Sequence, residues 1–586
     1  MIAPRHLRPD PGPSFAHDLA PRRTRIAGSS AATPALKEAF QKALGPDTAV
    51  LSPETPLVVD ADACLFGGRA LTSAEAWLRV LQLGALGRVE GAFALAQRTS
   101  EGEVFLARDA IGHRSLYYLV HGDQLLFASR LIALLDVAAL PRRLCLRSVA
   151  AYLAYAYLPG PETMVEGVFE LLLGEQVTFV NGVIHRSTHW DLPAEPSTFD
   201  GEEVLRLRLR ARLEEVVQQA LPGGAPVAIS LSGGIDSSLI AALAARLHDA
   251  PVHTFSITFG AGHRNELAWS TLVADHCHTQ HTVVELTPAA IAAHLDDTIA
   301  CLDKPNGDPL TVPNALLFRE MGKQAEVALN GEGGDPCFGG PKNLPMLLAE
   351  LYGNGAETAS GRRARERSFL RAHLKCHDDL PKLLTPAVMA EACSPPLEED
   401  LAPWFDDPRW SALVTRLMAI NVRFKGGHHI LPKVDSLSAP FGVFARSPLF
   451  ARSVVELAFT IPPRLMLHGA VEKYLLKQAV ADLLPAAILD RPKSGMMVPV
   501  EGWFQGPLLH EARSRILDGL APRGLFQRRY LEDLLDGKTG GLRPRHGVKI
   551  WLLITLEAHL RALGMGCGEP RAIPWWGFKA KNHGRR

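Results

Sequence analysis

The chain has 586 residues, more than one hydrophobic core supports, so we expect two or more domains. Basic and acidic residues number 62 each, and this zero net charge argues against nucleic acid or an anionic membrane as the main partner. No apolar run reaches about 18 residues and no apolar stretch is typical of a secretory signal, so we expect a cytoplasmic protein without a membrane span.

The eight cysteines are scattered and form no CxxC pair, which favours reduced thiols in a cytosol over disulfides or a zinc site. Histidines gather at His276, His278 and His281, and again at His428 and His429. Neither group has a convincing metal-ligand spacing, so we interpret both as polar surface residues or satisfied core histidines.

The first third of the chain contains two different patterns. Residues 1–35 are rich in proline, arginine, alanine and serine without periodicity, which predicts a poorly ordered lead-in. From about residue 48 to residue 185, short apolar runs alternate with turn residues, a pattern typical of a largely antiparallel β domain. Prolines and a glycine mark residues 186–202 as a linker. The predicted divisions are a lead-in at 1–35, a β-rich domain at 36–195, a second domain at 200–570 and a basic, aromatic tail at 571–586.

A glycine-rich stretch separates a predicted buried strand at 227–231 from a predicted helix at 239–245. It consists of Ser232, Gly233, Gly234, Ile235, Asp236, Ser237 and Ser238. Backbone N–H groups and the helix dipole at such a junction favour phosphate, the glycines permit close approach, and the serine hydroxyls are further donors. Asp236 would repel phosphate unless it holds a divalent cation. The stretch is neither a Walker A loop nor a GxGxxG motif, and the alternative interpretation is an ordinary strand-to-helix turn.

Strand and helix patterns alternate through the second domain, which predicts an α/β fold with a doubly wound parallel sheet. The last of these strands, at 327–330, enters a second glycine-rich loop at 331–340 that carries Glu332 and Asp335. Ligands of such sheets bind at the carboxyl ends of the strands. We therefore expect Asp236 and Asp335 to hold one cation between them, with a plain flexible turn as the alternative. After about residue 345 the pattern is mainly helical.

Together these segments resemble the asparagine synthetase superfamily, and the resemblance covers nearly the whole chain after the lead-in. The motifs that carry it are the ATP-pyrophosphatase-type loop 232–238, the acidic glycine loop 330–340, Lys433-Val434-Asp435 with Ala445-Arg446-Ser447-Pro448, Lys473, and Arg491-Pro492-Lys493. Residues 107–118 and 127–129 are similar to the superfamily's glutaminase-type domain. The resemblance implies a degenerate, glutaminase-like domain of the N-terminal nucleophile type, followed by an ATP-pyrophosphatase domain (adenine nucleotide alpha hydrolase-like) with helical additions.

The resemblance implies an ATP-dependent, AMP-forming ligase that joins a carboxylate to an amine. It implies Mg²⁺ on Asp236 and Asp335, with ATP contacts from Leu231, Ser232, Gly233, Gly234, Asp236, Ser237, Ser238, Ile257 and Gly331. Lys493 would stabilise the developing negative charge, Lys473 would assist at the phosphates, and Glu332 would orient or deprotonate the amine. For each lysine the alternative is a solvated surface charge.

The first domain departs from the superfamily's glutamine-hydrolysing pattern. That pattern uses an N-terminal cysteine as nucleophile, whereas the first cysteine here is Cys64. Asp60-Ala61-Asp62 stands where the superfamily carries Asn-Gly-Glu for glutamine, and Ala74 stands at a further glutamine-binding aspartate. We therefore expect this domain to keep its fold but to release no ammonia.

Two branches of the superfamily use an amine of the substrate itself, namely β-lactam synthetases and lasso-peptide cyclases. Asp335-Pro336-Cys337 replaces the usual Asp-Glu and is most similar to the cyclases, and Glu332 stands where β-lactam synthetases typically carry tyrosine. The resemblance thus favours macrolactam (isopeptide) closure of a lasso peptide core. A peptide or small-molecule carboxylate would be the substrate, with a leader peptidase and a leader-binding protein as partners. The alternatives are an asparagine-synthetase-like ligase that uses ammonia or a small amine, and a scaffold without catalysis.

Overall fold

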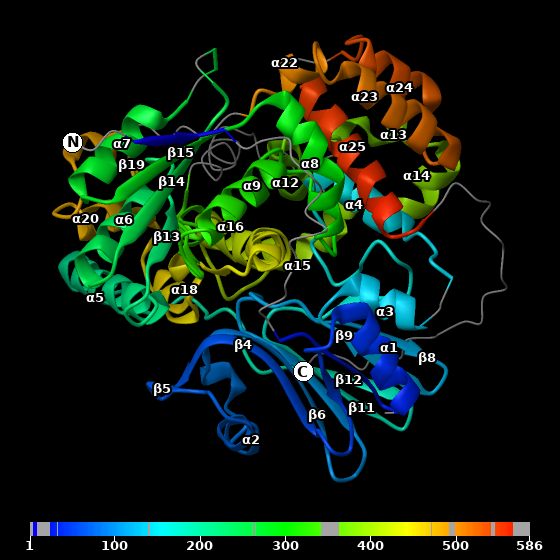
Figure 1. Ribbon diagram of the computed structural model, residues 1–586, viewed down its shortest axis with the longest axis horizontal. Coiled ribbons are helices and arrows are strands. Elements are labelled where there is room, and N and C mark those ends of the chain that lie inside the picture. Colours follow the sequence, from blue (N-terminus) through cyan, green and yellow to red (C-terminus); the bar gives the residue numbers. More distant parts are fainter. Residues whose placement is uncertain are drawn as a thin grey trace.

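The computed structural model of the protein describes residues 4–8, 24–31, 33–138, 141–260, 262–263, 265–340, 363–469, 471–491, 498–540 and 545–565. A β-rich domain and a larger α/β domain lie against each other, the former at the bottom of Figure 1. The predicted tail at 571–586 lies outside the described residues. None of the described helices combines the length and apolar character that crossing a membrane requires.

The first domain contains two facing β-sheets. The strand order of one sheet is β10 (Phe169–Glu170), β8 (Tyr117–His121), β9 (Gln124–Ala128), β2 (Ile26–Ser29) and β3 (Ala49–Leu51). The order of the other is β12 (Val183–Thr188), β11 (Glu175–Val180), β7 (Val104–Arg108), β6 (Glu90–Arg98), β4 (Leu57–Phe66) and β5 (Arg69–Ala70). Alternate side chains of both sheets, such as Ile26, Leu106 and Phe127, form a common buried core.

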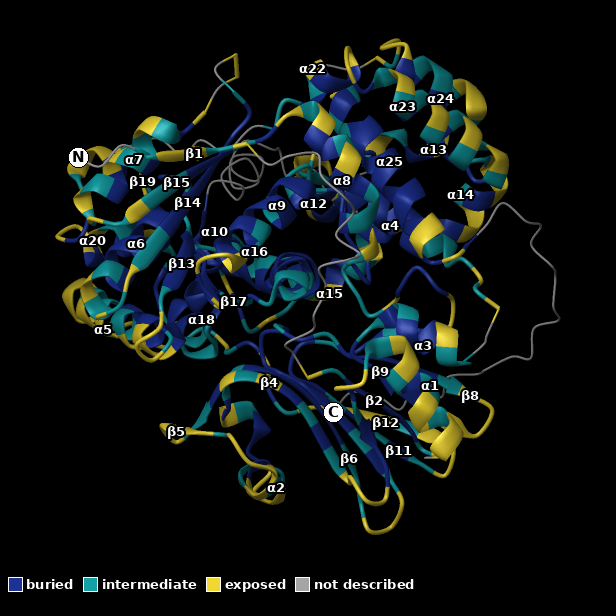
Figure 2. Cartoon of the chain, in the orientation of Figure 1, coloured by how far each residue is buried: buried dark blue, intermediate teal, exposed yellow. Residues whose placement is uncertain are grey.

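Helices cover the outer faces of these two sheets. Helices α1 (Pro34–Leu44) and α3 (Leu131–Ala138) pack on the first sheet, while α2 (Ala74–Gln82) packs on the second through Trp77 and Val80. Figure 2 shows that α1 and α2 each keep an exposed outer face. The sequence pattern of short strands thus forms a four-layered domain.

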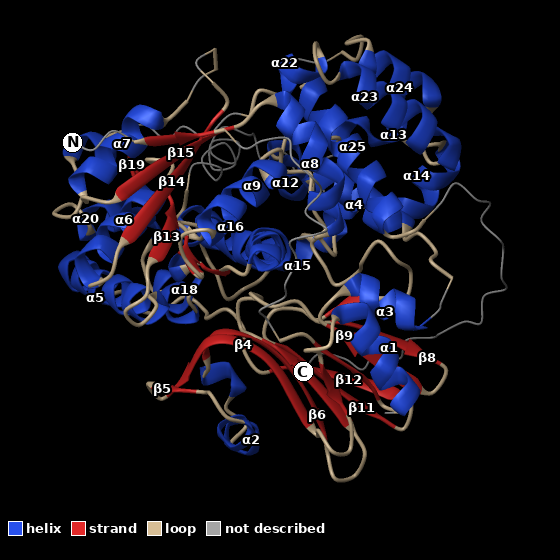
Figure 3. Cartoon of the chain, in the orientation of Figure 1, coloured by secondary structure: helices blue, strands red, loops and turns tan. Residues whose placement is uncertain are grey.

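The second domain is built on six parallel strands (Figure 3). Their order is β1 (Arg5–Leu7), β15 (Gln280–Glu285), β14 (Val252–Thr258), β13 (Val227–Ser230), β16 (Val327–Leu329) and β17 (Phe444–Arg446). The connecting helices are α5 (Glu202–Ala220), α6 (Ile235–Leu247), α7 (Leu267–His276), α8 (Pro288–Ala300) and α9 (Thr311–Gly322). The predicted α/β fold with a parallel sheet is confirmed.

Three short strands, β1, β2 and β17, correct the sequence prediction. Strand β1 and strand β2 both lie within the predicted lead-in at 1–35, so that prediction is wrong for these two segments. Strand β1 pairs with β15, and Arg8 forms an ion pair with Glu285 at 3.0 Å. Strand β17 interrupts the region predicted as mainly helical. Strands this short leave little periodicity in the sequence, because their stability comes from pairing with distant residues.

A helical region completes the second domain. Its helices are α10 (Gly334–Cys337), α12 (Ala364–Ala372), α13 (Leu380–Leu383), α14 (Pro386–Ala392), α15 (Ala402–Phe405), α16 (Leu413–Ile420), α17 (Leu431–Ser438), α18 (Arg452–Ala458), α19 (Pro463–Met466), α20 (Tyr474–Ala479), α21 (Ala486–Leu489), α22 (Val500–Phe504), α23 (Leu509–Ser514), α24 (Arg528–Leu535) and α25 (His546–Ala562). A π-helix, Asn421–Ile430, joins α16 to α17, and a small hairpin of β18 (Leu467–His468) and β19 (Val471–Glu472) precedes α20. Helix α4 (Leu146–Tyr155) extends into this region, where the Tyr152 hydroxyl donates to the Leu552 carbonyl at 3.1 Å.

Candidate active site

The first glycine-rich loop lies between β13 and α6 and is folded around Ser237. The Ser232 N–H donates to the Ser237 hydroxyl at 3.1 Å, and that hydroxyl donates to the Gly234 carbonyl at 3.1 Å. Gly233 has φ +72°, and a Cβ at this position would lie 2.5 Å from the Cβ of Trp269. The tight turn therefore requires glycine at this position.

The second glycine-rich loop is in direct contact with the first. A Cβ on Gly331 would lie 2.5 Å from the Ser237 nitrogen, and a Cβ on Gly334 would lie 2.1 Å from Asp236 Oδ1. No larger residue fits at either position without moving the loops apart. The two loops that the sequence placed at neighbouring strand ends thus form one continuous surface.

Lys473 joins the two acidic residues of these loops. Its ammonium group lies 2.7 and 2.5 Å from the two Asp236 carboxylate oxygens and 2.5 Å from Asp335 Oδ1. The Lys473 side chain is 2 % exposed, and its backbone has φ +53° immediately before α20. The structure therefore brings Asp236, Asp335 and Lys473 together, with the lysine ammonium between the carboxylates.

The two carboxylates match part of the donor set for Mg²⁺. Proteins bind this ion through one or two carboxylates, with substrate phosphates and water completing the octahedron. Asp236 and Asp335 keep 13 % and 25 % of their side chains exposed, so both can be reached from solvent. Within the described ranges no group of three or more histidine, cysteine or acidic side chains suits a metal, so phosphate oxygens would have to supply the rest.

A second buried ion pair lies beside Glu332. Lys433 donates to Asp308 at 2.7 Å, and its side chain is 4 % exposed. Burial alone would lower the pKa of the Lys433 ammonium, but the negative charges of Asp308 and Glu332 outweigh it, so the pKa is raised. From the sequence, Lys433 was identified only as part of the Lys433-Val434-Asp435 motif, and no pattern predicted a role for Asp308. Lys433 therefore holds a positive charge next to the acidic loop.

The other expected ATP contacts surround the first loop. Leu231 is buried directly after β13 and Ile257 is buried on the neighbouring strand β14, and the Leu231 N–H donates to the Phe255 carbonyl at 2.8 Å. Ser238 is fully buried, and its hydroxyl has no hydrogen-bond partner among the described residues. Asn330, which the sequence did not single out, has a buried amide nitrogen without a partner in the same described set.

Lys493 lies outside the described residues, but Arg491, two residues earlier, contacts the first glycine-rich loop. The Arg491 guanidinium donates to the Gly233 carbonyl at 2.9 Å and forms an ion pair with Glu266. It also lies over the Trp269 ring, 5.0 Å from the centroid. Arg491, the first residue of the Arg491-Pro492-Lys493 motif, thus lies against the first glycine-rich loop.

Two of the acidic residues at the expected glutamine positions, Asp60 and Asp62, take part in contacts with the second domain. Asp62 accepts two hydrogen bonds from the Arg446 guanidinium at 2.7 and 3.0 Å. Asp60 pairs with Arg114 at 3.3 Å, and Arg114 also pairs with Asp435 of α17. These acidic side chains are therefore part of the contact between the domains. Ala74 is the exposed first residue of α2.

Comparison with known proteins agrees with this arrangement. Residues 208–561 match the family described as asparagine synthase, and residues 77–190 match the glutamine amidotransferase domain. A putative glutamine-hydrolysing asparagine synthetase of Mycobacterium bovis is 28 % identical over 74 % of this chain and 70 % of its own length. A glutamine-hydrolysing asparagine synthetase of Bacillus subtilis is 24 % identical over 80 % of this chain and 77 % of its own.

Among solved structures, the NH3-dependent NAD synthetase of Campylobacter jejuni is 16 % identical, covers 36 % of this chain and 100 % of its own, and has a TM-score of 0.19. The glutaminase-like domain and the ATP-pyrophosphatase-like domain define an ATP-dependent, amide-forming ligase. The chain belongs to the asparagine synthase family.

Proposed function

We propose that this ligase couples a carboxylate to ammonia or an organic amine that enters from solution, without hydrolysing glutamine in its own first domain. The observation that carries the proposal is the ion pair between Asp62 and Arg446. The Asp62 carboxylate, which stands at an expected glutamine-binding position, is instead oriented toward the second domain by two hydrogen bonds from the Arg446 guanidinium. The first domain then serves as a support for the synthetase domain.

In the proposed reaction, the substrate carboxylate attacks the α-phosphate of ATP and forms an acyl-adenylate, and pyrophosphate leaves. Backbone N–H groups and hydroxyls of the 232–238 loop would hold the leaving pyrophosphate. Mg²⁺ on Asp236 and Asp335 would neutralise phosphate charge. Lys473 already holds both carboxylates, and its ammonium group would shift toward the phosphates when ATP enters. Lys493 is the expected charge stabiliser at the acyl phosphate.

The second step needs a neutral amine, because an ammonium group has no lone pair for attack. A free α-amine has a pKa of about 8, so a base near the acyl group raises the reactive fraction. Glu332 is the proposed base or orienting group, since it lies on the second loop beside Asp335. Attack on the carbonyl forms the amide bond and releases AMP.

A narrower candidate is closure of a macrolactam, the isopeptide ring of a lasso peptide. Its support is the sequence Asp335-Pro336-Cys337, in which proline stands at the usual second acid. Pro336 and Cys337 are both buried in α10, so this part of the loop presents no charged side chain where other members of the family carry an acid. For this candidate the substrate is a core peptide, and a leader peptidase and a leader-binding protein are the proposed partners.

The experiment measures AMP release by the full chain with MgATP and L-aspartate, adding ammonium chloride or glutamine as nitrogen source. Ammonium is expected to support asparagine formation and glutamine to support none, with no glutamate released. Glutamate release would overturn the proposal. If ammonium and small amines give no amide while a precursor core peptide cyclises, the narrower candidate replaces the broader one. Asp236→Asn is the inactive control, because it removes a proposed metal ligand but little volume.

A further inference from the structure

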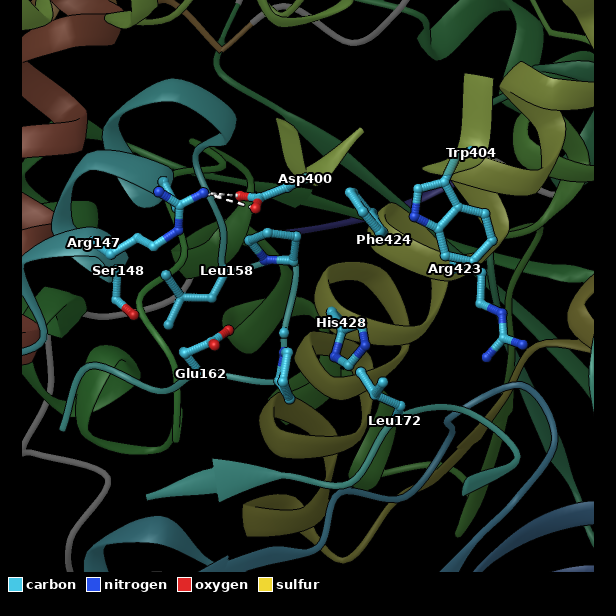
Figure 4. Close-up of a pocket in the computed structure, with 14 residues that line it drawn as sticks. Arg147, Ser148, Leu158, Glu162, Leu172, Asp400, Trp404, Arg423, Phe424 and His428 are labelled. Atoms are coloured by element: carbon cyan, nitrogen blue, oxygen red, sulfur yellow. Dashed lines mark hydrogen bonds and ion pairs between the residues drawn. The ribbon is translucent and has the colours of Figure 1, made fainter. Parts of the chain in front are cut away.

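A cavity of about 300 Å³ lies between the two domains (Figure 4). Its wall from the first domain is α4 with the loop 158–162, and its wall from the second domain is the π-helix Asn421–Ile430 with Trp404. The volume is at the lower end of the range of small-molecule sites. Helix α10 also packs against this π-helix, so the cavity and the second glycine-rich loop share one supporting element. π-helical segments frequently occur at functional sites.

One acidic side chain on the cavity lining has no basic partner among the described residues. Arg147 donates to both Asp400 oxygens at 2.7 Å, and Arg423 forms an ion pair with Asp191. The positive charges of Arg147 and Arg423 are thus each neutralised by an ion pair with an aspartate. The exposed Glu162 carboxylate makes no ion pair with any residue in the described part of the chain. Among the charged side chains on the lining, Glu162 is therefore the one without an oppositely charged partner in the described part of the chain, and its charge favours a cationic head group beside it.

His428 adds a hydrogen-bond acceptor to the same lining. Its Nδ1 lies 2.7 Å from the carboxylate of Glu170, which is fully buried. Burial raises the pKa of Glu170, but Arg108, Lys304 and His428 outweigh it and hold the pKa well below its usual range. Because the carboxylate is ionised, Nδ1 must donate. Burial lowers the pKa of His428 to about 4, so at neutral pH its other nitrogen, Nε2, carries a lone pair.

The ring of His428 is fixed in this orientation by its surroundings. Gly160, with φ +73°, lies so close to the imidazole that a Cβ would be 2.5 Å from Cε1. Trp404 and Phe424 form an edge-to-face pair with centroids 5.7 Å apart, and Leu158 and Leu172 complete the apolar part of the lining. The cavity thus combines two acceptors with a hydrocarbon wall.

We propose that this cavity binds a primary organic amine as its ammonium ion. The ammonium group donates to Glu162 and to His428 Nε2, while the hydrocarbon part of the ligand packs against Trp404 and Phe424. An anionic ligand of the same shape is repelled by Glu162. The proposal concerns equilibrium binding, and it stands whether or not the bound amine is the one that the ligase consumes.

The test is isothermal titration calorimetry of the full chain without ATP at pH 7.5, with benzylamine as the cationic probe. Benzyl alcohol and benzoate are probes of similar size with neutral and negative head groups. We expect saturable, one-to-one binding of benzylamine, with at least tenfold weaker binding of the other two. Absence of saturable binding, or equal affinity for benzyl alcohol, overturns the proposal.

Two variants and one control locate the site. Glu162→Gln removes the unmatched charge at an exposed position, and we expect about tenfold weaker benzylamine binding. Glu166→Gln is the control, because Glu166 lies a few residues after the 158–162 loop and outside the cavity, and among the described residues its ion-pair partner is Arg143, at 3.2 Å. Ala151→Leu places a larger side chain on the cavity wall and is expected to abolish binding, with circular dichroism to check the fold. Equal effects of Glu162→Gln and Glu166→Gln overturn the assignment. Amine-dependent AMP release is measured in a separate assay and tests the proposed function.

Discussion

Replacing Asp62 by asparagine tests whether this residue holds the domains together. The change keeps the shape of the side chain but removes its charge and one of the two oxygens that accept hydrogen bonds from Arg446. The Asp62 and Arg446 side chains are 10 % and 19 % exposed, which lies between a surface pair worth at most about 1 kcal/mol and a buried pair whose disruption costs roughly 3–5 kcal/mol. We therefore expect Asp62→Asn to lower the free energy of unfolding by about 2 kcal/mol.

The assay is urea unfolding followed by tryptophan fluorescence, together with a glutaminase measurement on each variant. A double-mutant cycle with Arg446→Gln isolates the pair, and we expect a coupling free energy of about 1–2 kcal/mol. Arg446 keeps its hydrogen bond to the Ala220 carbonyl at 2.7 Å in Asp62→Asn, so the local fold should persist. Asp123→Asn, in an exposed turn of the same domain, is the control and should stay within about 0.5 kcal/mol of the parent. Zero coupling, or glutamine hydrolysis that Asp62→Asn abolishes, refutes the reasoning.

Three further predictions concern the site and its support. Lys473→Gln leaves two facing carboxylates without their cation, so we expect at least a 100-fold loss of AMP formation and a melting temperature that rises more steeply with added MgCl₂ than in the parent; an unchanged Mg²⁺ response contradicts this. Gly334→Ala is expected to abolish AMP formation, because its Cβ would lie 2.1 Å from Asp236 Oδ1, whereas Gly234→Ala, with its nearest atom at 3.4 Å, should retain more activity; equal losses would count against the loop contact. His428 has a pKa of about 4 in the folded protein against roughly 6.5 in an unfolded chain. Protonation therefore favours unfolding, and the stability present above pH 6.5 is lost as pH falls toward 4. We expect His428 to account for about 2 kcal/mol of the stability lost between pH 7 and pH 5. The measurement is the free energy of unfolding in urea at several pH values, compared between the parent and His428→Gln. The same pH dependence in both proteins contradicts the prediction.

The sequence was sufficient to predict the parallel sheet and its two glycine-rich loops. Each loop follows an apolar strand in the sequence, so a local pattern contains the information. Strands β1 and β17 were not predictable in this way, because each has three residues and depends on a partner far along the chain. Their backbone hydrogen bonds are made with strands that no window of local sequence contains.

The same limit applies to the site. The strand-loop pattern placed Asp236 and Asp335 near one another, but it carried no sign that the Lys473 ammonium would lie between them. Asp308 is 125 residues from Lys433 along the chain, and nothing in its local sequence marks it as an ion-pair partner. Long-range charge pairs of this kind follow from the tertiary fold, so only motif resemblance drew attention to the lysines.

The buried charges between the domains give a physical reason for keeping the first domain even if, as proposed, it hydrolyses no glutamine. Glu170 of the first domain accepts hydrogen bonds from Lys304 at 2.5 Å and from His428 at 2.7 Å, both in the second domain. Arg108 of the first domain donates to the Gly427 carbonyl of the π-helix at 2.8 Å. Removing one partner of a buried ion pair costs several kcal/mol, because the other charge is left without compensation. Without the first domain, the ammonium of Lys304 and the π-helix that supports α10 would lose these partners. Through the π-helix, the first domain therefore supports helix α10 and the second glycine-rich loop, independently of any glutamine chemistry.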